Sequence, residues 1–217
     1  MIYSSIQDNW MRVEIMHSVA QSYYESTHDS DFRERIINRG APFPFDALQF
    51  DTMEKESCIV GMVMAWCVVT LESLVNHSLA DIMNNRTAAI VAIEYPGQIT
   101  NKLRNLPKMS SDLSKKLFIL SDSDENNSHI LSLADELSDT RNLVVHDKPF
   151  NYTDLGDGEV ALEHYRARGD SSKKIPRYED LDDFYEKCEQ IKSYIFSIIK
   201  SDAVGIDVIS FTALKNG

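Results

Sequence analysis

The sequence predicts a mainly α-helical protein, and three observations support this fold class. Apolar residues recur at three- and four-residue steps along most of the chain, which is the spacing of one face of an α-helix. The features of a β-hairpin occur in one short segment after residue 149. With 217 residues and 43% hydrophobic content, the chain can bury a substantial core as one domain with decorations, or at most one and a half domains.

The first fifty residues predict helices followed by a linker. One face of the first helix carries Ile6, Trp10, Val13, Met16 or His17, Ala20 and Tyr24. Residues 31–38 read as a short second helix that ends at Gly40, and two prolines indicate an extended linker over 41–46. We expect residues 1–50 either to pack on the main domain or to form an arm that binds a partner.

A long apolar helix is expected next, with its N-cap at Asp51 or Thr52 and its end near Asn84. Its few polar residues predict the central helix of a bundle, and its longest apolar run, 58–71, is too short to span a bilayer. The N-terminus lacks the basic and apolar regions of a signal peptide. We therefore expect a soluble cytoplasmic protein without a membrane partner.

Further helices complete the expected domain, which covers residues 51–200. They span residues 86–94, 99–106 and 111–120, the segment after an acidic loop at 121–127, and about 179–200. The tail, 201–217, contains apolar residues that could add a strand or pack on a partner.

The helix after the acidic loop carries the strongest functional signal. The first half of this helix has an apolar face formed by Ile130, Leu133, Ala134 and Leu137. Arg141 falls where the next apolar residue belongs, and a guanidinium on a core-facing position must meet an anion. Asn142 and His146 share one helical face, so the three side chains could border one cleft. Alternatively, an internal carboxylate satisfies Arg141 and His146 caps the last helical turn.

Arg141 to His146, Arg-Asn-Leu-Val-Val-His, resembles the R-x(4–6)-H signature of the HEPN superfamily, including the Asn after the Arg. Leu71 to Asn76 resembles the helix that packs beside the motif helix in that family. The order of predicted helices over about 53–199 resembles that of the family. Similarity of individual residues is limited to these two segments. It implies a HEPN-like helical bundle in which Glu72 holds Arg141. Many members are dimeric ribonucleases of toxin–antitoxin or antiviral systems, whereas others only bind.

A β-hairpin with basic residues is expected directly after the motif. Two strand-like segments flank Gly156-Asp157-Gly158. The residues that follow the hairpin, together with one lysine before it, form the densest basic stretch in an acidic chain. Their charges suit a phosphate backbone: Lys148, Arg166, Arg168, Lys173, Lys174 and Arg177. An ordinary solvated loop would show the same composition.

The residue types predict RNA cleavage without a metal or another cofactor. His146 titrates near neutrality and would act as base or acid, while Arg141 would grip the phosphate and Asn142 would orient His146. One His cannot easily fill both roles, so a homodimer would supply the second copy. The expected products carry 2′,3′-cyclic phosphate ends.

Composition limits the other function classes. The net charge of −12 gives no overall attraction to nucleic acid, which argues against a general RNA-coating protein. Cys58, Cys67 and Cys188 lack metal-site spacing and read as buried thiols in a reducing compartment. The alternative function is a non-catalytic helical module that binds a protein or nucleotide, and an antitoxin or regulatory protein is a further expected partner.

Overall fold

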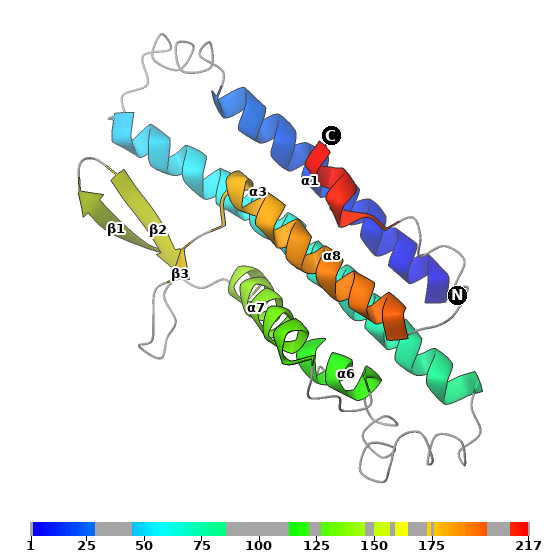
Figure 1. Ribbon diagram of the computed structural model, residues 1–217. Coiled ribbons are helices and arrows are strands. Elements are labelled where there is room, and N and C mark those ends of the chain that lie inside the picture. The colour runs from blue at the N-terminus through cyan, green and yellow to red at the C-terminus, as the bar shows by residue number, and fades with distance from the viewer. Residues whose placement is uncertain are drawn as a thin grey trace.

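A computed structural model gives the structure of the protein. It describes residues 2–28, 45–85, 113–121, 127–145, 150–156, 159–164, 173–174, 176–198 and 209–216. These residues are mainly α-helical, which confirms the predicted fold class. Figure 1 shows long helices lying along one another, with a small sheet at one end.

The first two helices, α1 (Ile2–His28) and α3 (Phe45–Asn85), run antiparallel and pack along each other (Figure 1). The predicted apolar face of α1 is buried through Ile6, Trp10, Val13, His17 and Ala20. Residues 1–50 therefore contribute α1 to the common core. The expected helix at 31–38 lies outside the described residues.

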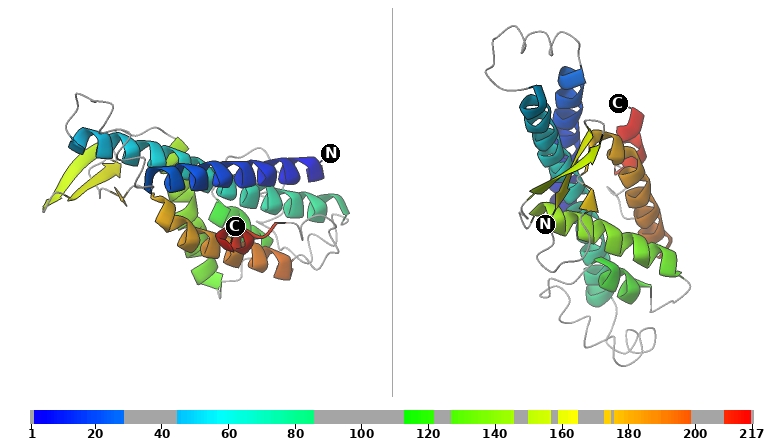
Figure 2. Two further views of the ribbon diagram at one scale, coloured as in Figure 1. Left: turned by 90° about the horizontal axis from the view of Figure 1, so that it is seen from above. Right: turned by 90° about the vertical axis from the view of Figure 1, so that its left-hand side faces the viewer.

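The central position of α3 explains its length and composition. This helix contacts α1, α6 (Leu113–Leu120), α7 (Ser128–Val145) and α8 (Leu181–Ile198), so it meets protein on several sides. A helix surrounded in this way must be apolar around most of its circumference. Two views in Figure 2 show α3 between α1 and the α7–α8 layer.

The predicted start of this helix at Asp51 or Thr52 is wrong, because α3 begins at Phe45. A proline directly before a helix does not prevent its first turn, and residues 46–50 contain no helix-breaking residue. The boundary expected after residue 50 consequently falls inside α3.

The last two large helices match their expected positions closely. In α7 the stripe through Leu133, Ala134 and Leu137 is buried. In α8 the buried residues are Leu181, Phe184, Tyr185, Cys188, Ile191, Lys192 and Ile195. Each large apolar side chain on such a face contributes about 1.5–3 kcal/mol when fully buried. The helices expected at 86–94 and 99–106 lie outside the described residues.

A small antiparallel sheet follows α7. Strand β1 (Phe150–Gly156) pairs with β2 (Glu159–His164), and β2 pairs with β3 (Lys173–Lys174). The β1–β2 register is irregular between Asp154 and Gly156. Figure 1 shows the sheet outside the helical bundle, near the end where α7 finishes and α8 begins.

The described part of the C-terminal tail packs on its own chain. Ile209 and Phe211 are buried, and η4 (Phe211–Asn216) is a 3-10 helix that contacts α8. The buried ammonium of Lys192 donates to the Ile209 carbonyl at 2.7 Å and pairs with Glu189, which accepts from the Phe211 N–H at 3.0 Å. The alternative of an added strand is therefore wrong for residues 211–216, which form η4. Packing of the tail on a partner stays a prediction.

One stretch among the described residues, Lys55–Leu79 of α3, is long and apolar enough to cross a membrane by length and composition. The expectation that the apolar run 58–71 is too short to span a bilayer stays a prediction. More than half of this stretch is buried inside the protein, and the core helix of a soluble bundle meets the same criterion.

The three cysteines occupy two environments. Cys67 and Cys188 are buried, as expected, whereas Cys58 is exposed. Cys58 lies four residues before Met62, which is also exposed, so both belong to the outer face of α3. The prediction of a buried Cys58 is wrong because an apolar segment still has one face outside the core.

Candidate functional site

The candidate site is formed where the C-terminal half of α7 crosses α3. Arg141 lies one helical turn after the buried Leu137, so its side chain continues the stripe of α7 that faces the core. It meets α3 at Glu72, one residue after the buried Leu71. An arginine and a glutamate thus occupy facing positions that apolar residues would otherwise fill.

The Arg141–Glu72 ion pair is present, as the resemblance implies. Arg141 Nη2 donates to Glu72 Oε1 at 2.8 Å, and Arg141 Nη1 donates to Asn142 Oδ1 at 3.0 Å. The side chains of Arg141 and Glu72 are 26% and 17% exposed, respectively. The guanidinium is therefore held from one side while part of its surface stays open to solvent.

The Arg141 guanidinium is only partly used by this pairing. Its Nε is buried and has no hydrogen-bond partner among the described residues. A guanidinium carries five N–H donors in a planar fork. The contacts with Glu72 and Asn142 account for two of them, so the group retains donors that suit the oxygens of a phosphate.

The structure describes only part of the predicted site. Glu72, Arg141 and Asn142 lie together at the α3–α7 contact. The other predicted catalytic residue, His146, lies outside the described residues, as do Lys148, Arg166 and Arg168. Lys173 and Lys174 form β3.

Arg177 is engaged inside the protein. Its Nε and Nη2 each donate to Glu56 at 3.1 Å, one to each carboxylate oxygen, and the Glu56 side chain is only 3% exposed. The same carboxylate accepts from the backbone N–H of Tyr178 at 2.9 Å. The forked edge of the Arg177 guanidinium is thus occupied by Glu56, while 29% of the Arg177 side chain stays exposed. The expected contact of Arg177 with RNA stays a prediction.

Glu56 is a residue that the sequence interpretation missed. It lies on α3 four, seven and eleven residues before the buried Val60, Val63 and Cys67, so it is in phase with the buried stripe of that helix. This signal is the one that identified Arg141, namely a charged residue at a core-facing position. It was overlooked because polar neighbours surround Glu56 near the expected start of the helix.

A cluster of rings lies beside the Arg177–Glu56 pair. His17 Nδ1 and the Tyr185 hydroxyl are 2.7 Å apart, and the His17 ring stacks on Tyr178 at a centroid distance of 6.3 Å. Burial lowers the pKa of the His17 imidazole, and the Asp182 carboxylate partly opposes this shift. His17 is therefore a buried core histidine that favours the neutral form.

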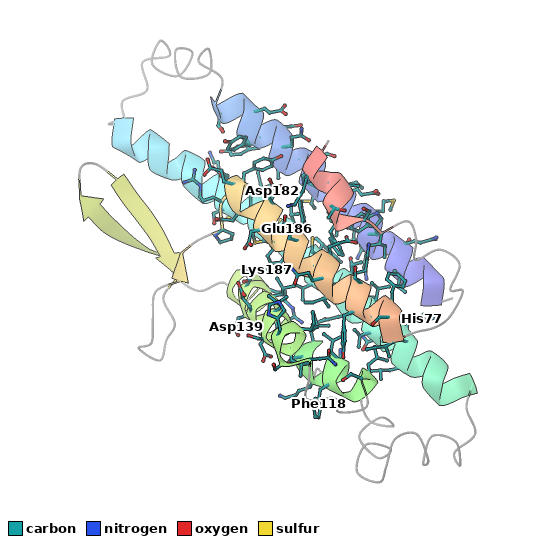
Figure 3. All side chains as sticks on the ribbon, in the orientation of Figure 1. His77, Phe118, Asp139, Asp182, Glu186 and Lys187 are labelled. Carbon is teal, nitrogen blue, oxygen red and sulfur yellow. The ribbon has the colours of Figure 1, made fainter. Side chains whose placement is uncertain are left out.

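A surface groove of about 450 Å³ lies elsewhere, between α8, the start of α7 and η4. Its lining includes Glu186 and Glu189, which pair with Lys215 and Lys192. Charged side chains continue along α8, among them Asp182, Glu186 and Lys187 (Figure 3). The residues that line this groove include no arginine or lysine, so they offer no cation for a phosphate and Arg141 remains the candidate RNA site among the described residues.

Comparisons of the chain with protein-family models, with curated proteins and with solved structures give no match. The candidate site is therefore judged on its own geometry and chemistry.

Proposed function

We propose that this protein is a HEPN-like, metal-independent endoribonuclease that cleaves RNA to 2′,3′-cyclic phosphate ends. The observation that carries the proposal is the Arg141 guanidinium, which Glu72 holds at 2.8 Å while its side chain remains 26% exposed. One N–H of Nη1 and one of Nη2 are not used in the described contacts, and such donors on a fixed guanidinium can bind the phosphate at which cleavage occurs.

The proposed division of labour follows from the residue types. Arg141 stabilises the charge that builds on the phosphate, and Glu72 fixes the orientation of its guanidinium. Asn142 supports the same guanidinium through Oδ1, which leaves its amide NH₂ group to donate to His146 or to the phosphate. His146, which follows the last residue of α7 in the sequence, supplies the acid or base, because histidine is the residue type whose ordinary pKa lies near neutral pH.

The mechanism needs two proton-transfer groups, so we propose a homodimer in which two motifs share the chemistry. We further propose that the protein acts in the cytoplasm as a toxin or antiviral effector, with an antitoxin or regulatory protein as partner.

The decisive experiment replaces His146 in purified protein and measures cleavage of a fluorescent RNA. We expect His146→Ala to lower the rate at least 100-fold, because loss of a general acid or base costs roughly 10²–10⁴-fold. The substitution Ser132→Ala, at an exposed position of the same helix, is the matched control. Cleavage by His146→Ala at the parental rate would refute the ribonuclease proposal.

A mixing experiment tests the shared site. Wild-type and His146→Ala subunits are refolded together at equal amounts, so that about half of the dimers contain one chain of each kind. If the centre needs His146 from both chains, these mixed dimers should be inactive and the mixture should keep about a quarter of the wild-type activity. A mixture with half of the wild-type activity would count against a shared centre.

The second candidate is a non-catalytic helical binding module, which one observation favours. Glu72 and Asn142 together engage two nitrogens of Arg141, so the pair could serve only to join α3 and α7. On that account Arg141→Ala should lower stability and leave no catalytic defect to measure, because the wild-type protein would not cleave RNA.

A further inference from the structure

Arg12 on α1 is a second arginine that α3 holds at the protein surface. Its guanidinium lies over the ring of Trp66 on α3, 4.5 Å from the ring centroid, and Arg12 Nη1 donates to Asn9 Oδ1 at 3.4 Å. Both partners are uncharged, whereas Arg141 is paired with the carboxylate of Glu72. Arg12 is also exposed, so among the described contacts its positive charge stays available to an anion from solution.

Contacts across α3 link Arg12 to the Arg141 site. Asn9 Nδ2 donates to Ser73 Oγ at 2.9 Å, so Asn9 contacts both Arg12 and α3. Ser73 directly follows Glu72, which accepts from Arg141 at 2.8 Å. The two arginines thus reach one segment of α3 from two helices, α1 and α7, between which α3 lies (Figure 2).

The surface of α3 between the two arginines is not buried. Trp66 and Glu72 are six residues apart, which corresponds to about 9 Å along the helix axis and about 120° around it. The residues of this segment that are not buried lie within that sector of the helix, which we call the open strip: Ala65, Trp66, Val69, Glu72, Ser73 and Asn76. Trp66 and Glu72 are its two edges, so Arg12 borders one edge and Arg141 the other.

Two cations at the edges of the open strip suit an extended polyanion. Each arginine contacts one residue of α3 and one asparagine of its own helix, and each keeps N–H donors that these contacts do not use. Successive phosphates in a stacked strand advance about 3.4 Å, so at least about three nucleotides span the strip. A dinucleotide has one phosphate and cannot reach both arginines, whereas a longer RNA can.

We propose that Arg12 binds a backbone phosphate of the same RNA strand whose scissile phosphate lies at Arg141. Trp66 and Asn9 are positioning residues, because they hold the Arg12 guanidinium beside the open strip. Arg12 touches the substrate but not the reacting atoms, so it contributes to affinity and not to the cleavage step. This inference rests on the proposed ribonuclease function and adds a second point at which a longer substrate is bound.

The test measures binding and cleavage with RNA of two lengths. A twelve-nucleotide RNA with 2′-O-methyl groups cannot be cleaved, because it lacks the 2′-OH nucleophile, and its affinity is measured by fluorescence anisotropy at several salt concentrations. An unmodified twelve-nucleotide RNA and a dinucleotide give KM and kcat. The variant Arg12→Gln removes the charge of Arg12 and keeps a polar side chain. Lys215→Gln is the matched control, because it removes the same charge from η4, where Lys215 pairs with Glu186.

We expect Arg12→Gln to weaken binding of the twelve-nucleotide RNA roughly threefold to tenfold. The plot of log affinity against log salt concentration should become less steep by about 0.7, which is the contribution of one phosphate contact in a single strand. KM for the cleavable RNA should rise by a similar factor with kcat kept, and the dinucleotide kinetics should not change. Lys215→Gln should leave the affinity, the salt dependence and KM unchanged.

A double-mutant cycle tests the positioning residues. Asn9→Ala and Trp66→Leu should each weaken RNA binding in the wild-type background and have little effect in the Arg12→Gln background, since both act through Arg12. General damage to the fold would weaken binding equally in the two backgrounds, and that result would overturn the positioning roles.

The outcomes also separate the two proposals. A wild-type protein that cleaves RNA, with an unchanged salt dependence and KM in Arg12→Gln, would overturn the role of Arg12 alone, as would equal losses in Arg12→Gln and Lys215→Gln. A wild-type protein that shows the expected Arg12 effect on binding but cleaves neither RNA would overturn the ribonuclease proposal alone. A wild-type protein that does not bind the twelve-nucleotide RNA would overturn both.

Discussion

The two arginine–glutamate pairs on α3 differ in how completely each guanidinium is used. Glu56 receives both the Nε and the Nη2 of Arg177 and is almost fully buried. Glu72 receives only the Nη2 of Arg141, whose Nε has no partner among the described residues. An arginine with both oxygens of a carboxylate on its fork is a structural anchor. Arg141 instead donates one N–H from Nη2 to Glu72 and one from Nη1 to Asn142, and the second N–H of each nitrogen is not used in the described contacts and is available to a ligand.

The largest expected effect concerns activity. Arg141→Ala should lower RNA cleavage roughly 100- to 1000-fold, because it removes a donor aimed at the phosphate. Arg177→Ala should lower cleavage of a dinucleotide less than about threefold in the fraction that folds, because its guanidinium serves Glu56. Initial rates on a dinucleotide measure both effects. Equal losses of cleavage rate in the two variants would show that the two ion pairs do not differ in their contribution to activity.

The next effect concerns stability, and here the order reverses. Glu56→Ala removes a buried carboxylate that accepts three hydrogen bonds and leaves the Tyr178 N–H without its acceptor, so we expect it to lower the free energy of unfolding by about 3 kcal/mol. Glu72→Ala should cost about 1–2 kcal/mol, because the more exposed Glu72 carboxylate accepts one hydrogen bond from Arg141. Urea unfolding measures both values. A larger loss for Glu72→Ala would contradict the anchor assignment.

A smaller effect concerns pH and belongs to the Arg177–Glu56 region alone. Burial lowers the pKa of His17 in the folded protein, so between that value and 6.5 the unfolded chain binds more protons. Stability from neutral His17 is fully present above about pH 6.5 and is lost as the pH falls toward the folded-state pKa. The neighbouring Tyr178 and Tyr185 stay neutral in this range, because burial raises the pKa of each, and Asp182 opposes the His17 shift.

The comparison of wild-type protein with His17→Gln tests this contribution. We expect the wild-type protein to lose more stability between pH 7.5 and 5.0 in urea unfolding than the variant does. The difference between the two pH slopes isolates His17 from the other histidines. Parallel slopes would show that His17 does not couple pH to folding.

The smallest effect is expected at the surface. Glu136→Gln breaks an ion pair in which the Glu136 side chain is 52% exposed. Exposed pairs of this kind contribute about 0.2–1 kcal/mol, so the variant should unfold almost like the parent. If Glu136→Gln lowered the free energy of unfolding as much as Glu72→Ala does, solvent exposure would not explain how much each ion pair contributes to stability.

Particular elements show what could be predicted from the sequence. The stripes of α1, α7 and α8 were predictable because burial of one helix face imposes a regular spacing on apolar residues. Arg141 stood out because it interrupts such a stripe. The start of α3 was not predictable, since a proline before residue 45 and an acceptable cap at Asp51 were both compatible with a helix end there.

The same distinction holds for the site. The resemblance pointed to Glu72 as the partner of Arg141, whereas nothing in the spacing paired Glu56 with Arg177 across 121 residues. The basic segment after residue 147 suggested that Arg177 is one more surface cation. Its internal role depends on where η3 (Tyr178–Asp180) places it against α3, which local sequence does not specify.

By itself, the sequence determined which segments form helices, which helix faces are apolar, and which charged residues lie in phase with those faces. The reason is that the 3.6-residue period of a helix decides on which face each residue lies. Only the tertiary structure decided which carboxylate each arginine meets and how much of each guanidinium stays open. That choice depends on how α3, α7 and η3 pack, and a buried charge takes whichever partner the packing brings within hydrogen-bond distance.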